Sequence, residues 1–122
     1  MTGNKKLVLI VEDDFALSDA FGMILTTGGY EVHLSHNGKE ALEYLEKRLP
    51  SVILLDILMP VMDGRDFLRA FKNEHNIPIV ALSNLDGKGD IEEVLSLGAT
   101  SYMLKSSVTP DKLTNLVHES IN

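Results

Sequence analysis

The stretch Ser51–Gly64, which reads SVILLDILMPVMDG, decides how this chain is organised. Within it, Val52–Leu55 is a run of consecutive apolar residues, the pattern of a strand that is buried on both faces of a parallel sheet. The run ends at Asp56, and Asp63-Gly64 then signals a turn and the start of a helix. Open α/β sheets place their chemistry beyond the carboxyl ends of the strands, so we interpret Asp56 as the reactive residue.

Short apolar runs alternate with helix-like segments along the whole chain. Apolar residues recur at helical spacing after every run. This order of strand and helix, repeated five times, predicts an α/β fold with a parallel sheet, helices on both faces and right-handed crossovers. The predicted strands are Leu7–Val11, Tyr30–Ser35, Ser51–Asp56, Ile77–Leu82 and Thr100–Leu104.

Capping residues predict where several of the helices begin. Asp14 is a candidate N-cap for the first helix, and Asn37 with Glu40 three residues later resembles a capping box. Thr109-Pro110 has the residue types of an N-cap and a first helical turn, so we expect the last helix to begin there.

The limits of two further helices are predicted from apolar spacing, proline and glycine. Leu42, Leu45 and Leu49 recur on one face of the second helix, so we expect that helix to continue to Pro50. The segment Gly87–Gly89, with its two glycines, is a weak start for the fourth helix and marks a candidate mobile element.

The composition limits the classes of protein to which the chain can belong. Its 122 residues have the size of one domain, and its apolar runs are shorter than the ~20 residues of a membrane helix. The absence of cysteine excludes disulfides and thiol chemistry, and the initial MTGNKK has no signal-peptide pattern. We therefore expect a cytoplasmic protein. The net charge of −7 argues against nucleic-acid binding and favours either plain solubility or a cation site.

Polar residues follow four of the predicted strands. Glu12-Asp13 ends the first, Asp56 the third, Ser83 the fourth and Lys105 the fifth. If the sheet has the order 2-1-3-4-5, the first and third strands are neighbours and their carboxylates come close together. Such carboxylates repel one another unless a cation lies among them, and oxygen ligands without His or Cys suit Mg²⁺.

The same edge of the sheet has the residue types needed to handle a phosphoryl group. A metal ion and the Lys105 ammonium can neutralise phosphoryl oxygens, while the Ser83 hydroxyl can donate a hydrogen bond. Carboxylates can form acyl phosphates, so Asp56 is the candidate nucleophile.

The chain resembles the receiver domain of two-component response regulators. Four motifs carry the resemblance in the family's order and spacing: IVEDD at Ile10–Asp14, D-x-x-M-P-x-x-D-G at Asp56–Gly64, IPIVALS at Ile77–Ser83 and GATSYMLK at Gly98–Lys105. The resemblance implies a flavodoxin-like three-layer (βα)5 sandwich with sheet order 2-1-3-4-5. Because it covers essentially the whole chain, we expect a single receiver domain over residues 1–122, without an output domain.

The resemblance also implies an acceptor and a metal site. Asp56 matches the family's phospho-acceptor aspartate. Glu12 and Asp13 match the acidic pair that holds Mg²⁺, with Asp13 as the expected direct ligand. Asp56 itself and the backbone carbonyl of Leu58 match the remaining metal ligands from the protein.

Three further residues match positions that respond to the phosphoryl group. Ser83 matches the switch hydroxyl, Tyr102 the aromatic residue coupled to it, and Lys105 the family's lysine. Two neighbours depart from the family pattern. Ser106 stands where proline usually follows in a cis bond; a cis Lys-Ser bond would cost about 3 kcal/mol, which favours a trans bond. Asn84 replaces a small residue and could crowd the phosphoryl site or change the rate of dephosphorylation.

The partners implied by the resemblance are proteins. The donor is a phosphohistidine on a sensor histidine kinase or a histidine phosphotransfer protein, and the output is a downstream effector or a further phosphotransfer. We expect no direct nucleic-acid binding and a monomer, or a weak homodimer through the face formed by the last two strands and helices. The protein would catalyse its own phosphorylation and dephosphorylation without being a conventional enzyme.

Three other interpretations remain open from the residues. A phosphatase with an aspartyl-phosphate intermediate usually has a second aspartate two residues after the nucleophile, where this chain has Leu58. A flavodoxin-like cofactor binder needs a hydroxyl-rich phosphate loop, where this chain has the acidic Glu12–Asp14. A degenerate receiver would bind partners without phosphorylation.

Overall fold

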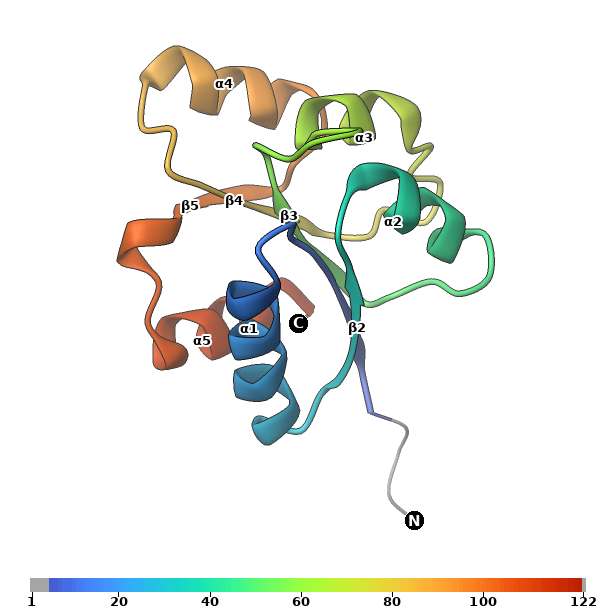
Figure 1. Cartoon of the computed structure of the whole chain (residues 1–122), viewed down its shortest axis with the longest axis vertical. Helices are drawn as coiled ribbons and strands as arrows, with labels where there is room; N and C mark the ends of the chain where they lie inside the picture. The colour runs from blue at the N-terminus through green and yellow to red at the C-terminus, as the bar shows by residue number, and fades with distance from the viewer. Residues whose placement is uncertain (1–4, 122) are drawn as a thin grey trace.

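Strands and helices alternate along the chain in a computed structural model that describes residues 5–121 (Figure 1). The strands are β1 (Leu7–Val11), β2 (Glu31–Ser35), β3 (Val52–Asp56), β4 (Ile79–Ser83) and β5 (Ser101–Leu104). The helices are α1 (Phe15–Thr27), α2 (Gly38–Leu45), α3 (Gly64–Ala70), α4 (Lys88–Ser96) and α5 (Pro110–Ile121), with a short 3₁₀ turn at Lys105–Ser107.

The strands form one parallel sheet in the order β2-β1-β3-β4-β5. Helices α1 and α5 lie on one face, and α2, α3 and α4 lie on the other (Figure 1). The expected flavodoxin-like three-layer fold is confirmed. No helix within residues 5–121 is both long enough and apolar enough to cross a bilayer.

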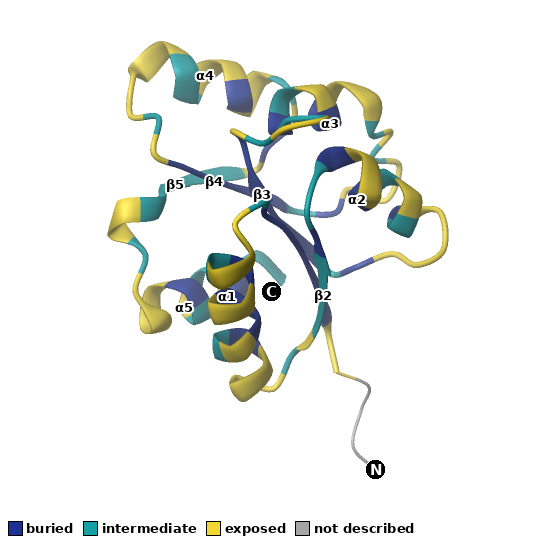
Figure 2. Cartoon of the chain, viewed as in Figure 1, coloured by how far each residue is buried: buried dark blue, intermediate teal, exposed yellow. Residues whose placement is uncertain are grey.

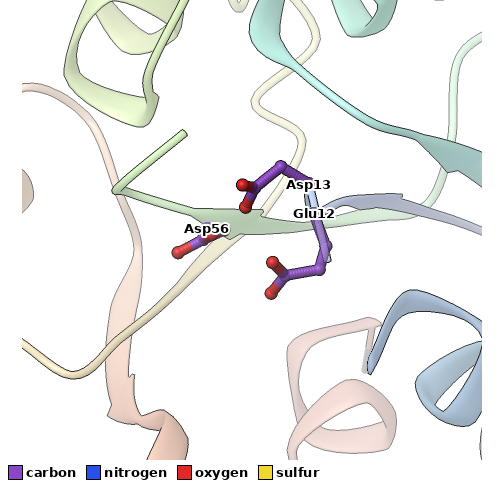
Figure 3. A group of neighbouring side chains, drawn as sticks. All are labelled: Glu12, Asp13 and Asp56. Atoms are coloured by element: carbon purple, nitrogen blue, oxygen red, sulfur yellow. The ribbon is translucent and has the colours of Figure 1, made fainter. Parts of the chain in front are cut away.

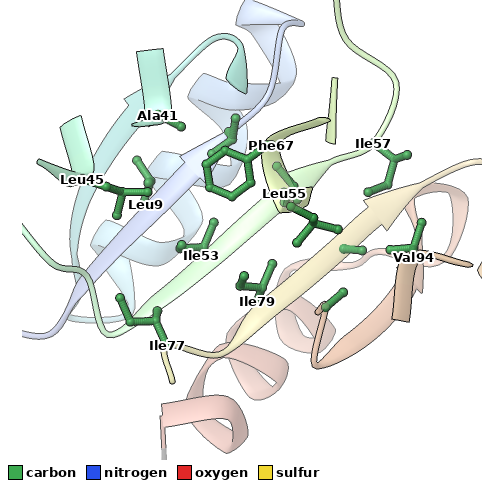
Figure 4. Close-up of a cluster of buried hydrophobic side chains, with 14 residues drawn as sticks. Leu9, Ala41, Leu45, Ile53, Leu55, Ile57, Phe67, Ile77, Ile79 and Val94 are labelled. Atoms are coloured by element: carbon green, nitrogen blue, oxygen red, sulfur yellow. The ribbon is translucent and has the colours of Figure 1, made fainter. Parts of the chain in front are cut away.

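The sheet separates two apolar clusters because successive side chains of a strand point to opposite faces. Leu9, Ile53 and Leu55 belong to the cluster beneath α2, α3 and α4 (Figure 4). Their neighbours Ile10 and Leu54 belong to the cluster beneath α1 and α5. Strands β1, β3 and β4 are buried at every position, as their unbroken apolar runs predict (Figure 2).

The predicted helix starts are confirmed by capping hydrogen bonds. The Asp14 carboxylate accepts from the backbone amide of Leu17 at 3.1 Å. The Asn37 side chain accepts from the amide of Glu40 at 2.9 Å. The Glu40 carboxylate accepts from the amide of His36, one residue before the N-cap, so the arrangement is close to a capping box but its second bond is displaced by one residue. Such caps stabilise a helix end by about 1 kcal/mol each.

Two element limits differ from the sequence-based expectation by more than one residue. Helix α2 ends at Leu45 and not at Pro50, because the amides of Lys47 and Arg48 both bond to the Tyr44 carbonyl in a tight last turn. Leu49 is therefore outside the helix and 45% exposed.

Strand β4 begins two residues after the start of its apolar run, because the Asn73 side chain takes the hydrogen bonds of the Ile77 backbone. The Asn73 side chain accepts from the amide of Ile77 and donates to its carbonyl, both at 2.8 Å. These bonds hold Ile77 outside the sheet, so the ladder starts at Ile79.

Gly64 at the start of α3 packs directly on the end of β3. A Cβ at this position would lie 2.7 Å from the backbone oxygen of Asp56. We predict that Gly64→Ala lowers the free energy of unfolding by more than about 2 kcal/mol, because backbone atoms must move. Gly89→Ala in α4 is the control: a Cβ there meets no atom within 4 Å and should stabilise by up to about 1 kcal/mol. Urea unfolding measures both, and equal effects would contradict the packing argument.

A cluster of charged residues at the carboxyl ends of the strands

Three carboxylates meet where β1 and β3 end. Because the two strands are neighbours in the sheet, Glu12 and Asp13 after β1 are brought beside Asp56 at the end of β3. One oxygen from each carboxylate lies within 4.8 Å of those of the other two (Figure 3). Glu12 and Asp56 are only 2% and 3% exposed, whereas Asp13 is partly exposed.

The Lys105 ammonium lies between two of these carboxylates. Its Nζ is 2.7 Å from an oxygen of Glu12 and 3.1 Å from an oxygen of Asp56. The residue stands in the 3₁₀ turn that follows β5, and its bond to Ser106 is trans, like the other peptide bonds of residues 5–121. The sequence had left the isomer of this bond undecided, and the trans form is the one that the cost of a cis Lys-Ser bond favours.

The cluster contains more negative than positive charge, and this changes how Asp56 ionises. Burial, and then the neighbouring Glu12 carboxylate, raise the pKa of Asp56 to about 7, although Lys105 opposes the rise. Burial alone would lower the pKa of Lys105, but its contacts with Glu12 and Asp56 raise it overall. The lysine therefore stays charged while the carboxylates remain short of a positive partner.

The donor set of this cluster fits a hard divalent cation. Glu12, Asp13 and Asp56 offer oxygen ligands alone, the kind that Mg²⁺ prefers. The backbone amide of Leu58 donates weakly to Asp56 at 3.4 Å, so the loop after β3 folds back onto the cluster. The metal-binding role of the Leu58 carbonyl stays a prediction.

Ser83 and Tyr102 contact the same residue at the start of the loop between β4 and α4. The Ser83 hydroxyl accepts from the backbone amide of Leu85 at 3.2 Å, and the Tyr102 hydroxyl donates to the carbonyl of Leu85 at 2.7 Å. Ser83 is buried at the end of β4, one residue beyond Leu82, which pairs with Asp56. Asn84 is exposed.

A family model described as "Response regulator receiver domain" matches residues 8–118. This chain belongs to that family. The resemblance inferred from the four motifs is thereby confirmed.

The curated relatives of this receiver domain include longer proteins. A probable transcriptional regulator, ycf27, of Porphyra purpurea is 34% identical over 105 residues, which are 86% of this chain and 43% of that protein. The protein of the same name from Cyanophora paradoxa is 34% identical over 102 residues, with 84% and 43% covered. The chain thus spans less than half the length of these relatives.

Solved structures of similar proteins share the fold closely. A CheY-like response regulator receiver domain protein from Methanospirillum hungatei aligns with a TM-score of 0.89 and 29% identity, over 97% of this chain and 94% of that one. The chemotaxis protein CheY4 of Vibrio cholerae aligns with a TM-score of 0.89 and 28% identity, over 96% and 99%.

Sequence reasoning missed a strained residue in the loop after β3 of the receiver domain. Val61 has a φ of 69°, in the left-handed region that β-branched residues rarely adopt, and it is 79% exposed. The Met62 carbonyl accepts from the amide of Gly38 at 2.9 Å, which fixes the loop on the start of α2. No local sequence signal marks Val61, because glycine or asparagine is the usual indicator of this conformation.

We predict that Val61→Gly raises the free energy of unfolding by about 0.5–1 kcal/mol. The gain from relieved strain exceeds the added entropy of the unfolded chain, and the exposed side chain buries little surface. Val61→Ala is the control, because alanine keeps the Cβ and relieves only part of the strain. Thermal unfolding measures the order of the three proteins, and a destabilised glycine variant would show that Val61 is unstrained.

The raised pKa of Asp56 predicts how stability depends on pH. Between its ordinary value of 3.8 and about 7, the folded state keeps a proton on Asp56 that the unfolded state has released. This group therefore lowers the free energy of unfolding progressively over that interval, and by a constant amount above it. Asp56→Asn should stabilise the protein by on the order of 1–3 kcal/mol near pH 8, and by almost nothing near pH 4.

Urea titrations across this pH range measure the effect of Asp56→Asn. Asp19→Asn is the matched control, because Asp19 is an exposed carboxylate on α1 and its removal should change little at any pH. A destabilised Asp56→Asn protein near pH 8 would mean that the attraction of Lys105 outweighs burial and repulsion.

Proposed function

We propose that this receiver domain is a phosphorylation-dependent signalling switch that accepts a phosphoryl group on Asp56. The observation that carries the proposal is the position of this buried carboxylate, beside the Lys105 ammonium and within an acidic cluster suited to Mg²⁺. The donor would be a phosphohistidine on a sensor histidine kinase or a histidine phosphotransfer protein.

The proposed reaction is a direct transfer between the donor and Asp56. A carboxylate oxygen of Asp56 forms a bond to phosphorus while the phosphorus–nitrogen bond of the donor breaks. The leaving imidazole takes up a proton, and the acyl phosphate remains on the protein. Attack of water on that acyl phosphate releases inorganic phosphate and regenerates the carboxylate, so the protein promotes its own modification and reversal without acting as a conventional enzyme on other substrates.

The surrounding residues would stabilise charge and position the reacting groups. Lys105 can move its ammonium from the carboxylates to a phosphoryl oxygen, and Ser83 can donate its hydroxyl to another. Glu12, Asp13 and Asp56, with the Leu58 carbonyl, would hold Mg²⁺. When bound, this ion supplies positive charge to the carboxylates and the incoming phosphoryl group, and lowers the pKa of Asp56 into the ionised, nucleophilic range.

The response would begin at Leu85. When the Ser83 hydroxyl turns to the phosphoryl group, it gives up its bond to the Leu85 amide, and the Tyr102 ring can follow because it bonds to the same residue. The surface formed by β4, β5, α4 and α5 would then change. We propose that a cytoplasmic effector protein, a second phosphotransfer partner or a weakly associating copy of the chain reads this surface.

The proposal predicts a covalent adduct that depends on both Asp56 and Mg²⁺. Incubation with phosphoramidate and Mg²⁺ should add the mass of one phosphoryl group to the intact protein, as measured by mass spectrometry. Removal of the metal with a chelator should slow the gain by at least about tenfold, because the carboxylates then repel the anionic donor.

Two variants test the assignment of the acceptor. Asp56→Asn should give no adduct, whereas Asp19→Asn, which removes an exposed carboxylate from α1, should react like the unmodified chain. Failure of the unmodified chain to react under any condition would refute the switch and favour a receiver that only binds partners.

A further inference from the structure

Helix α4 has few contacts that hold it in place. All of its residues are described, and among them Val94 alone is buried. Its N-cap, Gly87, offers no side-chain cap, and Gly89 weakens the first turn further. The helix that follows the switch loop is therefore held to the rest of the domain by little apolar packing.

Two ion pairs of Arg65 on α3, with Asp90 and Glu93 on α4, supplement this packing, and together they are called the ionic fork. The Nη2 of Arg65 donates to Asp90 at 3.2 Å, and its Nε donates to Glu93. Asp90 and Glu93 stand three residues apart on α4 and so share the face that meets α3. The Arg65 side chain is 20% exposed, less than the 44% of either carboxylate. The planar guanidinium can engage both carboxylates, which a lysine cannot do with the same geometry.

The fork begins directly beside the acceptor. Gly64 packs on the backbone oxygen of Asp56, and its amide donates to the carbonyl of Ile57 at 2.8 Å. Arg65 is the next residue, so α3 carries its guanidinium from the end of β3 to α4. This connection is separate from the one through Ser83, Leu85 and Tyr102.

We propose that Arg65 is a positioning residue whose ionic fork restrains α4 in the resting conformation of the switch, in which Ser83 is bonded to Leu85. The inference rests on the proposed phosphorylation of Asp56. Partly exposed ion pairs are individually weak, so the fork can favour the resting state without preventing its release. Its loss should shift the population toward the responsive state by roughly two- to tenfold.

The test compares Arg65→Gln with Arg48→Gln. Both substitutions remove one positive charge and a two-pronged ion pair, but Arg48 pairs with Glu31 of β2, away from α4. Arg65→Gln should accept a phosphoryl group from phosphoramidate roughly two to ten times faster than the unmodified chain. Arg48→Gln should react at the same rate as the unmodified chain. Hydrogen exchange at amides 88–96 of the unphosphorylated protein should rise by a similar factor in Arg65→Gln alone.

Two further variants separate positioning from a general loss of stability. Arg65→Lys keeps the charge but not the fork, so it should give an intermediate rate. Asp90→Asn combined with Glu93→Gln breaks the fork from α4 and leaves Arg65 in place, so it should reproduce the faster reaction. Faster reaction together with protection unchanged outside 88–96 supports the proposal.

Several results would overturn this inference. An unchanged or slower reaction in both Arg65→Gln and the double variant would show that the fork does not favour the resting state. Equal exchange at 88–96 in all variants would show that α4 is held by other contacts. If the unmodified chain accepts no phosphoryl group, the proposed function fails, yet the exchange measurement still decides whether the fork restrains α4.

Discussion

The ion pairs of Lys105 with Glu12 and Asp56 are the interaction on which the chemistry of the candidate site depends. A parallel sheet brings the carboxyl ends of its strands to one edge, so residues far apart in the chain meet there as like charges. One ammonium at 2.7 and 3.1 Å balances only part of that charge. The remaining negative charge attracts a cation to this edge of the sheet. It also makes the pKa of Asp56 sensitive to any charged group that binds beside it.

The rest of the fold divides into a rigid part and a loosely held part. Strands β1, β3 and β4 are buried throughout, and they hold the carboxylates in place. Strand β5 is only partly buried at every position, and α4 buries Val94 alone. Asp56 thus lies on strands whose displacement would expose much apolar surface. The surface proposed to respond includes β5 and α4, which bury little and can move at a low cost in free energy.

The sequence predicted the strands and the polar residues at their ends well, because both follow from local patterns, whereas the sheet order that brings those residues together came from the resemblance to receiver domains. Unbroken apolar runs mark buried strands, and the residue after each run is placed by the topology. The end of α2 and the start of β4 were misjudged, since a carbonyl of Tyr44 and the side chain of Asn73 settle them through individual hydrogen bonds. The fork of Arg65 joins residues 25 and 28 positions apart, and the φ of Val61 has no residue-type signal, so neither was predictable. The roles of Tyr102 and of the Leu58 carbonyl remain predictions.

The sheet also separates the packing around the switch residues from the packing of α1. Leu85, Tyr102 and the loop methionines Met59 and Met62 all pack in the cluster beneath α2, α3 and α4. Helices α1 and α5 fill a different cluster on the opposite face. Because substitutions without shared neighbours combine additively, the side chains of α1 can change without altering the packing around Leu85 and Tyr102, whereas α5 belongs to the surface proposed to respond.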